Sequence, residues 1–152
     1  MKNYIVDTNI LVSLVRGDRI SQMFEAKYFK AENRLFTSVV VQGELASLAL
    51  QWKWGSSKVW QMQEVLYRFI IHPIKAKDIL TAYARIDAYS QGKLEGKPLP
   101  IGVSARNMGK NDLWIAATAH AAAATLVTTD NDFDHLRSSF IGVDWVDIKS
   151  YF

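Results

Sequence analysis

The 152-residue sequence contains no cysteine. This absence excludes disulfides, thiolate nucleophiles and cysteine-based zinc sites, and it is typical of proteins that work in a reducing cytoplasm. The sequence also lacks any run of about 18 to 20 apolar residues, which a membrane-spanning helix needs, and its first residues do not form a signal peptide. We therefore expect a cytoplasmic protein without a membrane partner.

Proline and glycine are scarce outside one segment. The chain has three prolines and eight glycines, and residues 92–109 hold two of those prolines and four of those glycines. This segment is the predicted long loop. No linker, repeat or low-complexity tract divides the rest, so we expect a single domain over residues 1–152, a length that buries roughly two-thirds of the unfolded surface.

Neither positive nor negative residues predominate in the sequence. Eighteen basic and 15 acidic residues give a net charge of +3 and a pI near 9.1, which favours a polyanionic partner only weakly. Hydrophobic residues make up 49% and charged residues 22%, which excludes a disordered chain.

What is present is an alternation of short apolar strands with helical segments. Strands are predicted at residues 4–6, 34–37, 69–74, 125–128 and 143–148, and helices at 10–15, 20–29, 38–51, 56–68, 75–91 and 111–124, with a turn and short helix at 130–139. This alternation predicts an α/β fold with a mainly parallel sheet and helices on both faces.

Four acidic residues occur where strands end or helices begin. Asp7 follows the first strand, Asp130 follows the strand at 125–128, and Asp112 and Glu44 lie near helix starts. Since both kinds of position meet at one edge of a parallel sheet, the four carboxylates are expected to come together. Each aspartate alone could also be a helix cap or turn residue. Glu44 interrupts a helix that is apolar on most of its circumference, where a carboxylate is costly unless it meets a cation.

These segments resemble the four acidic motifs of PIN domains, in order. The motifs are Asp7-Thr8-Asn9, the helix around Glu44, the segment from Asn111 to Ala119, and the segment from Leu126 to Phe133. The resemblance implies a Rossmann-like fold, a Mg²⁺ or Mn²⁺ site and endoribonuclease activity. For the VapC branch it implies a toxin, a small antitoxin as partner, and a homodimer. It also makes Asp7, Glu44, Asp112 and Asp130 the catalytic and metal-binding residues, with Asn9, Thr128 and Asp132 as supporting polar groups.

The chemistry of RNA cleavage fits such a cluster. Mg²⁺ and Mn²⁺ prefer oxygen ligands, and a bound ion can activate water and stabilise charge on the attacked phosphate. Without a metal, the carboxylates would repel a polyanion. Lys97, Arg106 and Lys110 flank Asp112 in sequence and are the predicted phosphate contacts, although a solvated loop is an equal alternative.

Other functions compete with the nuclease as interpretations of this sequence. A haloacid-dehalogenase-type phosphatase needs a second aspartate where Asn9 stands, and a receiver domain has no use for Glu44. An RNA-processing nuclease that is not a toxin, and a PIN domain that binds RNA or protein without cutting, stay open. His72, His120 and His135 are expected to be structural, and Trp52, Trp54 and Trp60 are expected to pack against the body or a partner, with base stacking as the alternative.

Overall fold

The computed structural model describes residues 1–73 and 77–152 of the chain. Its centre is a five-stranded sheet in the order β3-β2-β1-β4-β5, in which every neighbouring pair is parallel. The chain order reverses between β1 and β4, which is the switch point of a doubly wound sheet. The strands are β1 (Lys2–Val6), β2 (Asn33–Ser38), β3 (Ile70–His72), β4 (Thr125–Thr128) and β5 (Val143–Trp145).

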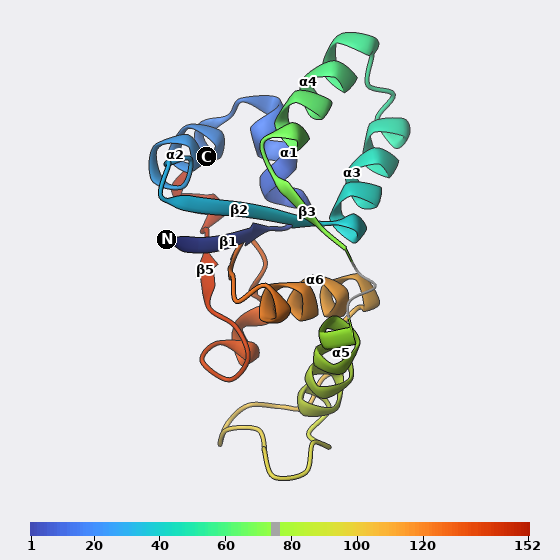
Figure 1. Ribbon diagram of the computed structural model, residues 1–152, viewed down its shortest axis with the longest axis vertical. Coiled ribbons are helices and arrows are strands. Elements are labelled where there is room, and N and C mark those ends of the chain that lie inside the picture. Colours follow the sequence, from blue (N-terminus) through green and yellow to red (C-terminus); the bar gives the residue numbers. More distant parts are fainter. Residues whose placement is uncertain (74–76) are drawn as a thin grey trace.

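Helices cover both faces of the sheet, as the sequence predicted (Figure 1). One face carries α1 (Thr8–Arg16), α2 (Arg19–Lys27) and α4 (Ser56–Tyr67), and the other carries α5 (Lys77–Ser90) and α6 (Lys110–Ala121). Helix α3 (Val39–Gln51) rises from the sheet edge at the end of β2, and the short 3-10 helices are η1 (Asn131–Leu136) and η2 (Ile148–Ser150).

Side-chain caps start several helices close to where a strand ends. The Asp7 carboxylate accepts a hydrogen bond from the Ile10 amide at 3.4 Å, and the Ser38 hydroxyl accepts one from the Val41 amide at 3.1 Å. Such caps satisfy amide groups that have no partner within the helix. They fix the sharp turns by which β1 and β2 pass into α1 and α3, and so fix one edge of the sheet.

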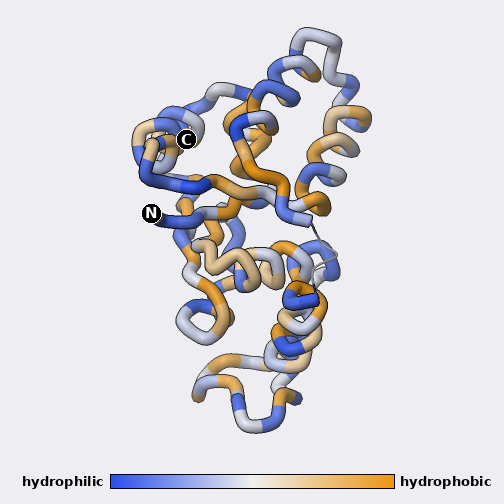
Figure 2. Tube along the Cα trace, viewed as in Figure 1, coloured by the Kyte–Doolittle hydropathy of each residue, from blue (hydrophilic) through white to orange (hydrophobic). Residues whose placement is uncertain are grey.

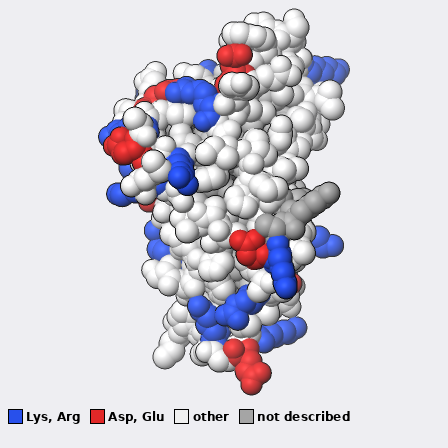
Figure 3. Space-filling model, in the orientation of Figure 1, with Lys and Arg blue, Asp and Glu red and all other residues white. Residues whose placement is uncertain are grey.

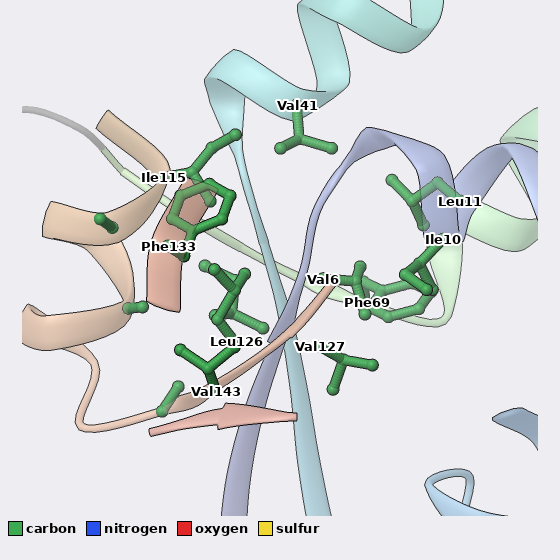
Figure 4. Packing of buried hydrophobic residues seen from close by; sticks show 14 of the residues in the cluster. Val6, Ile10, Leu11, Val41, Phe69, Ile115, Leu126, Val127, Phe133 and Val143 are labelled. Atoms are coloured by element: carbon green, nitrogen blue, oxygen red, sulfur yellow. The ribbon is translucent and has the colours of Figure 1, made fainter. Parts of the chain in front are cut away.

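The core lies on both faces of the central strands. In Figure 4, Leu126 lies on the same side as Ile115 and Phe133, while the next residue, Val127, lies on the other side with Ile10. Successive strand residues point to opposite faces, so a strand covered on both sides needs consecutive apolar residues. Figure 2 shows these hydrophobic segments at the centre of the fold, and also shows that α3 is hydrophobic over much of its length.

Several predicted boundaries differ from the observed ones for local reasons. The strand expected at 143–148 ends at Trp145, because Asp147 caps η2 by accepting from the Lys149 amide at 3.1 Å. The helix expected at 111–124 ends at Ala121, and Ala123 follows with a left-handed φ of 49°. The end of the strand expected at 69–74 and the start of the helix expected at 75–91 lie partly outside the described residues.

No helix within the described ranges has the length and apolar character that crossing a bilayer requires.

Candidate active site

A cavity of about 730 Å³ opens beside the switch point, where β1 and β4 end. All four acids singled out from the sequence line it, so the fold brings together residues that are up to 123 positions apart. It is built from the start of α1, one face of α3, the start of α6 and the turn after β4. The lining residues are Asp7, Thr8, Asn9, Val39, Val40, Gly43, Glu44, Ser47, Leu48, Gln51, Asn111, Asp112, Ile115 and Asp130.

Three of the acidic side chains at this edge form the tightest group. One carboxylate oxygen from each of Asp112, Asp130 and Asp132 lies within 4.8 Å of the others. Asp132 is more exposed than the other two, and the sequence had placed it among the supporting groups. The geometry makes it a third candidate ligand, brought inward by η1: the Asp132 amide donates to the Asp130 carboxylate at 2.9 Å.

Asp7 is the most deeply buried of the acids and is 6% exposed. One of its oxygens caps α1, and the other accepts a hydrogen bond from the Thr128 hydroxyl. Burial raises the pKa of Asp7 from 3.8 to about 6; these two hydrogen bonds oppose the shift, while the charges of Asp130 and Asp112 add to it. Asp7 therefore combines the structural role of a helix cap with the environment of a functional carboxylate.

Thr128 and Asn9 connect the two turns that flank the switch point. The Thr128 hydroxyl donates to Asp7 and accepts from the Asp130 amide at 3.0 Å. The Asn9 amide donates to the Thr129 hydroxyl at 3.3 Å. These contacts tie the turn after β1 to the turn after β4 and hold Asp130 in place relative to Asp7.

Glu44 is half-buried and lies beside a hydroxyl group. Its carboxylate accepts from the Thr8 hydroxyl at 3.1 Å, and among the described residues it forms no ion pair. Although α3 is apolar on most of its circumference, it buries only Val41, Leu45 and Ala49, and Glu44 borders the cavity beside that narrow stripe.

Asp112 lies in the first turn of α6, where the helix dipole favours an anion. Its pKa is nevertheless raised from 3.8 to about 6, first by burial and then by the charges of Asp130, Asp132 and Glu44. A divalent cation would relieve this repulsion. The donor set is entirely oxygen, which suits Mg²⁺ or Mn²⁺ and gives a softer metal no thiolate or imidazole.

The three basic residues proposed for phosphate contacts occupy different surroundings. Lys97 donates to the Ser139 carbonyl at 2.8 Å, and its ammonium lies 4.5 Å from the centre of the Phe140 ring. Arg106 is half-buried and lies near His135. Burial lowers the pKa of His135, and the positive charge of Arg106 lowers it further. Lys110 is exposed and lies two residues before Asp112. In Figure 3, Lys and Arg gather at the lower end of the molecule, around the long loop.

The histidines and tryptophans lie outside the cavity lining. His135 approaches the Ser90 hydroxyl at 2.7 Å, and His120 approaches the Phe140 carbonyl at 2.8 Å. Trp54 packs against the core under Lys58, whereas Trp52 and Trp60 are exposed.

Sequence reasoning missed several residues of the cavity wall. Thr8 belongs to the motif Asp7-Thr8-Asn9. Its hydrogen bond to Glu44 joins residues 36 positions apart, so no local sequence pattern predicts it. Ser47 and Gln51 could have been found, because they follow Glu44 at three and seven positions and so share its face of the helix.

Comparisons with known proteins agree with this architecture. A family model described as "PIN domain" matches residues 4–138. The fold is similar to VapBC2 from Rickettsia felis, solved with a promoter DNA fragment, with 22% identity, a TM-score of 0.71, and coverage of 95% of this chain and 99% of that one. For VapBC-1 from nontypeable Haemophilus influenzae the identity is 21%, the TM-score 0.69 and the coverage 94% and 97%.

A toxin-antitoxin complex from Klebsiella pneumoniae is also similar, with 23% identity, a TM-score of 0.62 and coverage of 93% and 95%. At such identities these likenesses establish the fold. A search of curated proteins gave no match.

Proposed function

The chain belongs to the PIN domain family, and from this premise we propose that it is a metal-dependent endoribonuclease, the toxin of a VapBC-type toxin-antitoxin pair. One observation carries the proposal: Asp7, Glu44, Asp112 and Asp130 line one cavity at the switch point of the sheet. The family is one of nucleases, and a cluster of carboxylates is suited to phosphodiester hydrolysis only when cations offset its charge.

On this proposal, Asp112 and Asp130 are direct metal ligands, assisted by Asp132, and Asp7 and Glu44 complete the acidic wall. Bound Mg²⁺ or Mn²⁺ would supply an activated water and would stabilise charge on the attacked phosphate. Thr128 fixes Asp130 against Asp7, and Thr8 fixes Glu44. Because these supports come from α1 and β4, the acidic side chains are held before substrate arrives.

The partners in this proposal are RNA, a small antitoxin and a second copy of the chain. Three structural relatives carry VapBC or toxin-antitoxin names, which supports the antitoxin. We further propose a single domain over residues 1–152 that acts in the cytoplasm, where its RNA substrates are found. An RNA-processing nuclease without an antitoxin would have the same site, so the activity and the biological role need separate tests.

The activity is tested by incubating the purified protein with structured and single-stranded RNAs, with Mg²⁺, with Mn²⁺ and with a chelator. Cleavage that requires metal is expected. Binding without cleavage in every condition would instead identify a non-cleaving PIN domain.

The toxin role is tested by co-expressing the chain with any short reading frame beside its gene. Copurification of the two products, together with loss of cleavage in the complex, is the expected result. Cleavage without such a partner would favour the RNA-processing nuclease.

A further inference from the structure

The cavity extends beyond the carboxylates along one face of α3. Its wall includes Val40, Gly43, Ser47 and Gln51, which are spaced by three or four residues and therefore lie on one side of the helix. This side lies away from the buried stripe of α3, its residues Gly43, Ser47 and Gln51 are exposed, and it runs from the first turn to the last residue of the helix. We call these four residues the α3 groove.

The cavity has far more room than a metal ion needs. An ion with six coordinated waters or equivalent oxygens, at about 30 Å³ each, takes roughly 180 Å³. The whole cavity measures about 730 Å³, which lies in the range of cavities that hold organic ligands. The cavity therefore has room for an organic group beside the ion.

The chemistry of the α3 groove favours an uncharged ligand. Within the described part of the chain, its lining contains no Lys, Arg or His, and Glu44 lies among the lining residues. A phosphate would find no cation there. Gln51 donates one amide hydrogen to the Ser47 hydroxyl at 2.9 Å. The Ser47 hydroxyl hydrogen, the second Gln51 amide hydrogen and the Gln51 amide oxygen are left to bind the edge of a base or a ribose hydroxyl.

Gly43 has no structural reason to be glycine. It lies in the middle of α3, its φ is not positive, and a Cβ added there would meet nothing within 4 Å. Glycine at such a position destabilises a helix relative to alanine. The missing side chain keeps the wall of the cavity flat, one residue before Glu44.

We propose that the α3 groove is the subsite for the unpaired nucleoside that adjoins the cleaved phosphate of single-stranded RNA. Gly43 admits the nucleoside, and Ser47 and Gln51 bind it. In duplex RNA the bases are stacked inside the helix and their edges are paired, so only an unpaired base can enter. The inference rests on the proposed ribonuclease activity and names the residues of α3 that hold the nucleoside.

The test compares Gly43→Ala, Gly43→Leu and the control Ala46→Leu. Ala46 is exposed on α3 and does not line the cavity, so the control adds the same leucine side chain outside the groove. Gly43→Ala is expected to raise the melting temperature. Gly43→Leu is expected to keep the Mn²⁺ affinity, but to lower cleavage of single-stranded RNA by roughly a hundredfold, as for a misplaced substrate. Ala46→Leu is expected to cleave normally.

The outcomes separate this inference from the proposed function. If the wild-type protein cleaves no RNA with metal, the proposed function fails. If the wild type and both leucine variants cleave equally well, the ribonuclease stands and the subsite is overturned. If Gly43→Leu keeps cleavage but loses the copurifying partner, the groove holds a peptide and the subsite is again overturned.

An independent observation concerns the fully buried hydroxyl of Ser90, the last residue of α5. The hydroxyl lies 2.7 Å from the His135 Nε2 atom in η1 and 3.3 Å from the Met108 sulfur. The Ser90 carbonyl also accepts from the Arg106 amide at 2.8 Å. Ser90 thus joins η1, which follows Asp130, to the segment that leads into Asp112.

We infer that Ser90 is a positioning residue for the metal ligands. When the Ser90 hydroxyl is removed, η1 and the segment before Asp112 stay folded but can shift relative to each other. Residues bonded directly to metal ligands typically contribute 10- to 100-fold to metal affinity. Ser90 acts one contact further out, so Ser90→Ala is expected to weaken Mn²⁺ binding by up to about tenfold, the lower end of that range. The control is Tyr89→Phe, which removes a buried contact of 3.1 Å to Ser139 from the same end of α5.

Mn²⁺ titrations followed by electron paramagnetic resonance measure the affinity without any RNA. Equal affinities in Ser90→Ala and Tyr89→Phe would overturn the inference. His135→Phe removes the same contact from its other side, so it should give the same loss, and the double variant no further loss. Additive losses in the double variant would show that the two residues act separately, and would also overturn it.

Discussion

At the scale of single residues, the acids of the cavity differ in what supports them. Asp7 is a helix cap with both oxygens engaged, whereas Asp112 projects from the first turn of α6 and has raised pKa through burial and neighbouring charge. These environments predict different responses to the same chemical change. Replacing a carboxylate with its amide removes the charge with little change of shape. The substitution therefore separates the role of the charge from the role of the side chain's shape and hydrogen bonds.

Asp112→Asn is expected to reduce metal-dependent RNA cleavage by more than about a hundredfold, since a ligand should matter at least as much as an outer partner. Circular dichroism should show an intact fold. The matched control is Asp134→Asn. It removes an exposed carboxylate that forms an ion pair with Arg137 at 3.5 Å. Full metal-dependent cleavage by a folded Asp112→Asn protein would remove Asp112 from the site.

Asp7→Asn is expected to stabilise the metal-free protein at pH 7.5. The pKa of Asp7 is raised from 3.8 to about 6, so the folded state disfavours the charged form and the cost is present above pH 6. As pH falls through 6 toward 4, the folded carboxyl becomes protonated and the cost disappears. The difference in melting temperature between variant and wild type should therefore shrink between pH 7.5 and pH 5, measured with a chelator.

Groups that do not interact with Asp7 titrate alike in both proteins and cancel in this difference. Asp112, which repels Asp7 and has a pKa raised to about 6, loses its charge over the same range and adds to the decrease. A difference that stays constant over the same pH range would mean that Asp7 carries no burial cost. A destabilised variant at pH 7.5 would mean that its role as a cap outweighs its charge.

At the scale of elements, the long loop between α5 and α6 has two kinds of basic residue. Lys97 is held by the Ser139 carbonyl and the Phe140 ring, while Lys110 is exposed at the start of α6. The loop is therefore attached to the segment after η1 through Lys97, and the helix that follows it begins with the exposed charge of Lys110.

Lys110→Ala is expected to weaken RNA binding and to reduce the slope of log K against log salt by about 0.7, the value for one lost contact to a single strand. Lys97→Ala is expected to leave this slope unchanged and to lower stability by roughly 1 to 2 kcal/mol, because it removes a charged hydrogen bond. Salt titrations of RNA binding and thermal melts measure both. The reverse pattern would place Lys97, and not Lys110, on the RNA.

At the scale of the whole molecule, we expect the acid cluster to couple folding to metal binding. Carboxylates from four separate segments of the chain converge, so their repulsion is present only in the folded state. An ion that binds this arrangement and not the unfolded chain stabilises the fold by mass action.

Added Mg²⁺ or Mn²⁺ is expected to raise the melting temperature in a concentration-dependent way. At 100 times the dissociation constant the gain is about 2.7 kcal/mol, or roughly 5 to 10 °C for a protein of this size. Sodium chloride at matched ionic strength is the control, and Asp112→Asn should respond less than the wild type. Equal responses to sodium and magnesium salts would contradict a specific site.

The sequence by itself determined the local features of this protein. Capping residues such as Ser38 mark where a helix starts, and consecutive apolar residues such as Leu126 and Val127 mark a strand covered on both faces. The order of these elements predicts a parallel sheet, and the ends of its strands predict the edge at which Asp7 and Asp130 meet. These signals can be read because capping and periodicity depend on near neighbours, and the succession of elements is written along the chain.

Only the tertiary structure decided how the site is arranged. The approach of Asp132 to Asp112, the support of Asp7 by Thr128, and the attachment of Lys97 to Ser139 all join residues distant in sequence. Burial also decided that the pKa values of Asp7 and Asp112 rise to about 6. Distances between non-neighbouring side chains, and their removal from water, exist only once the elements have packed, so no local pattern encodes them.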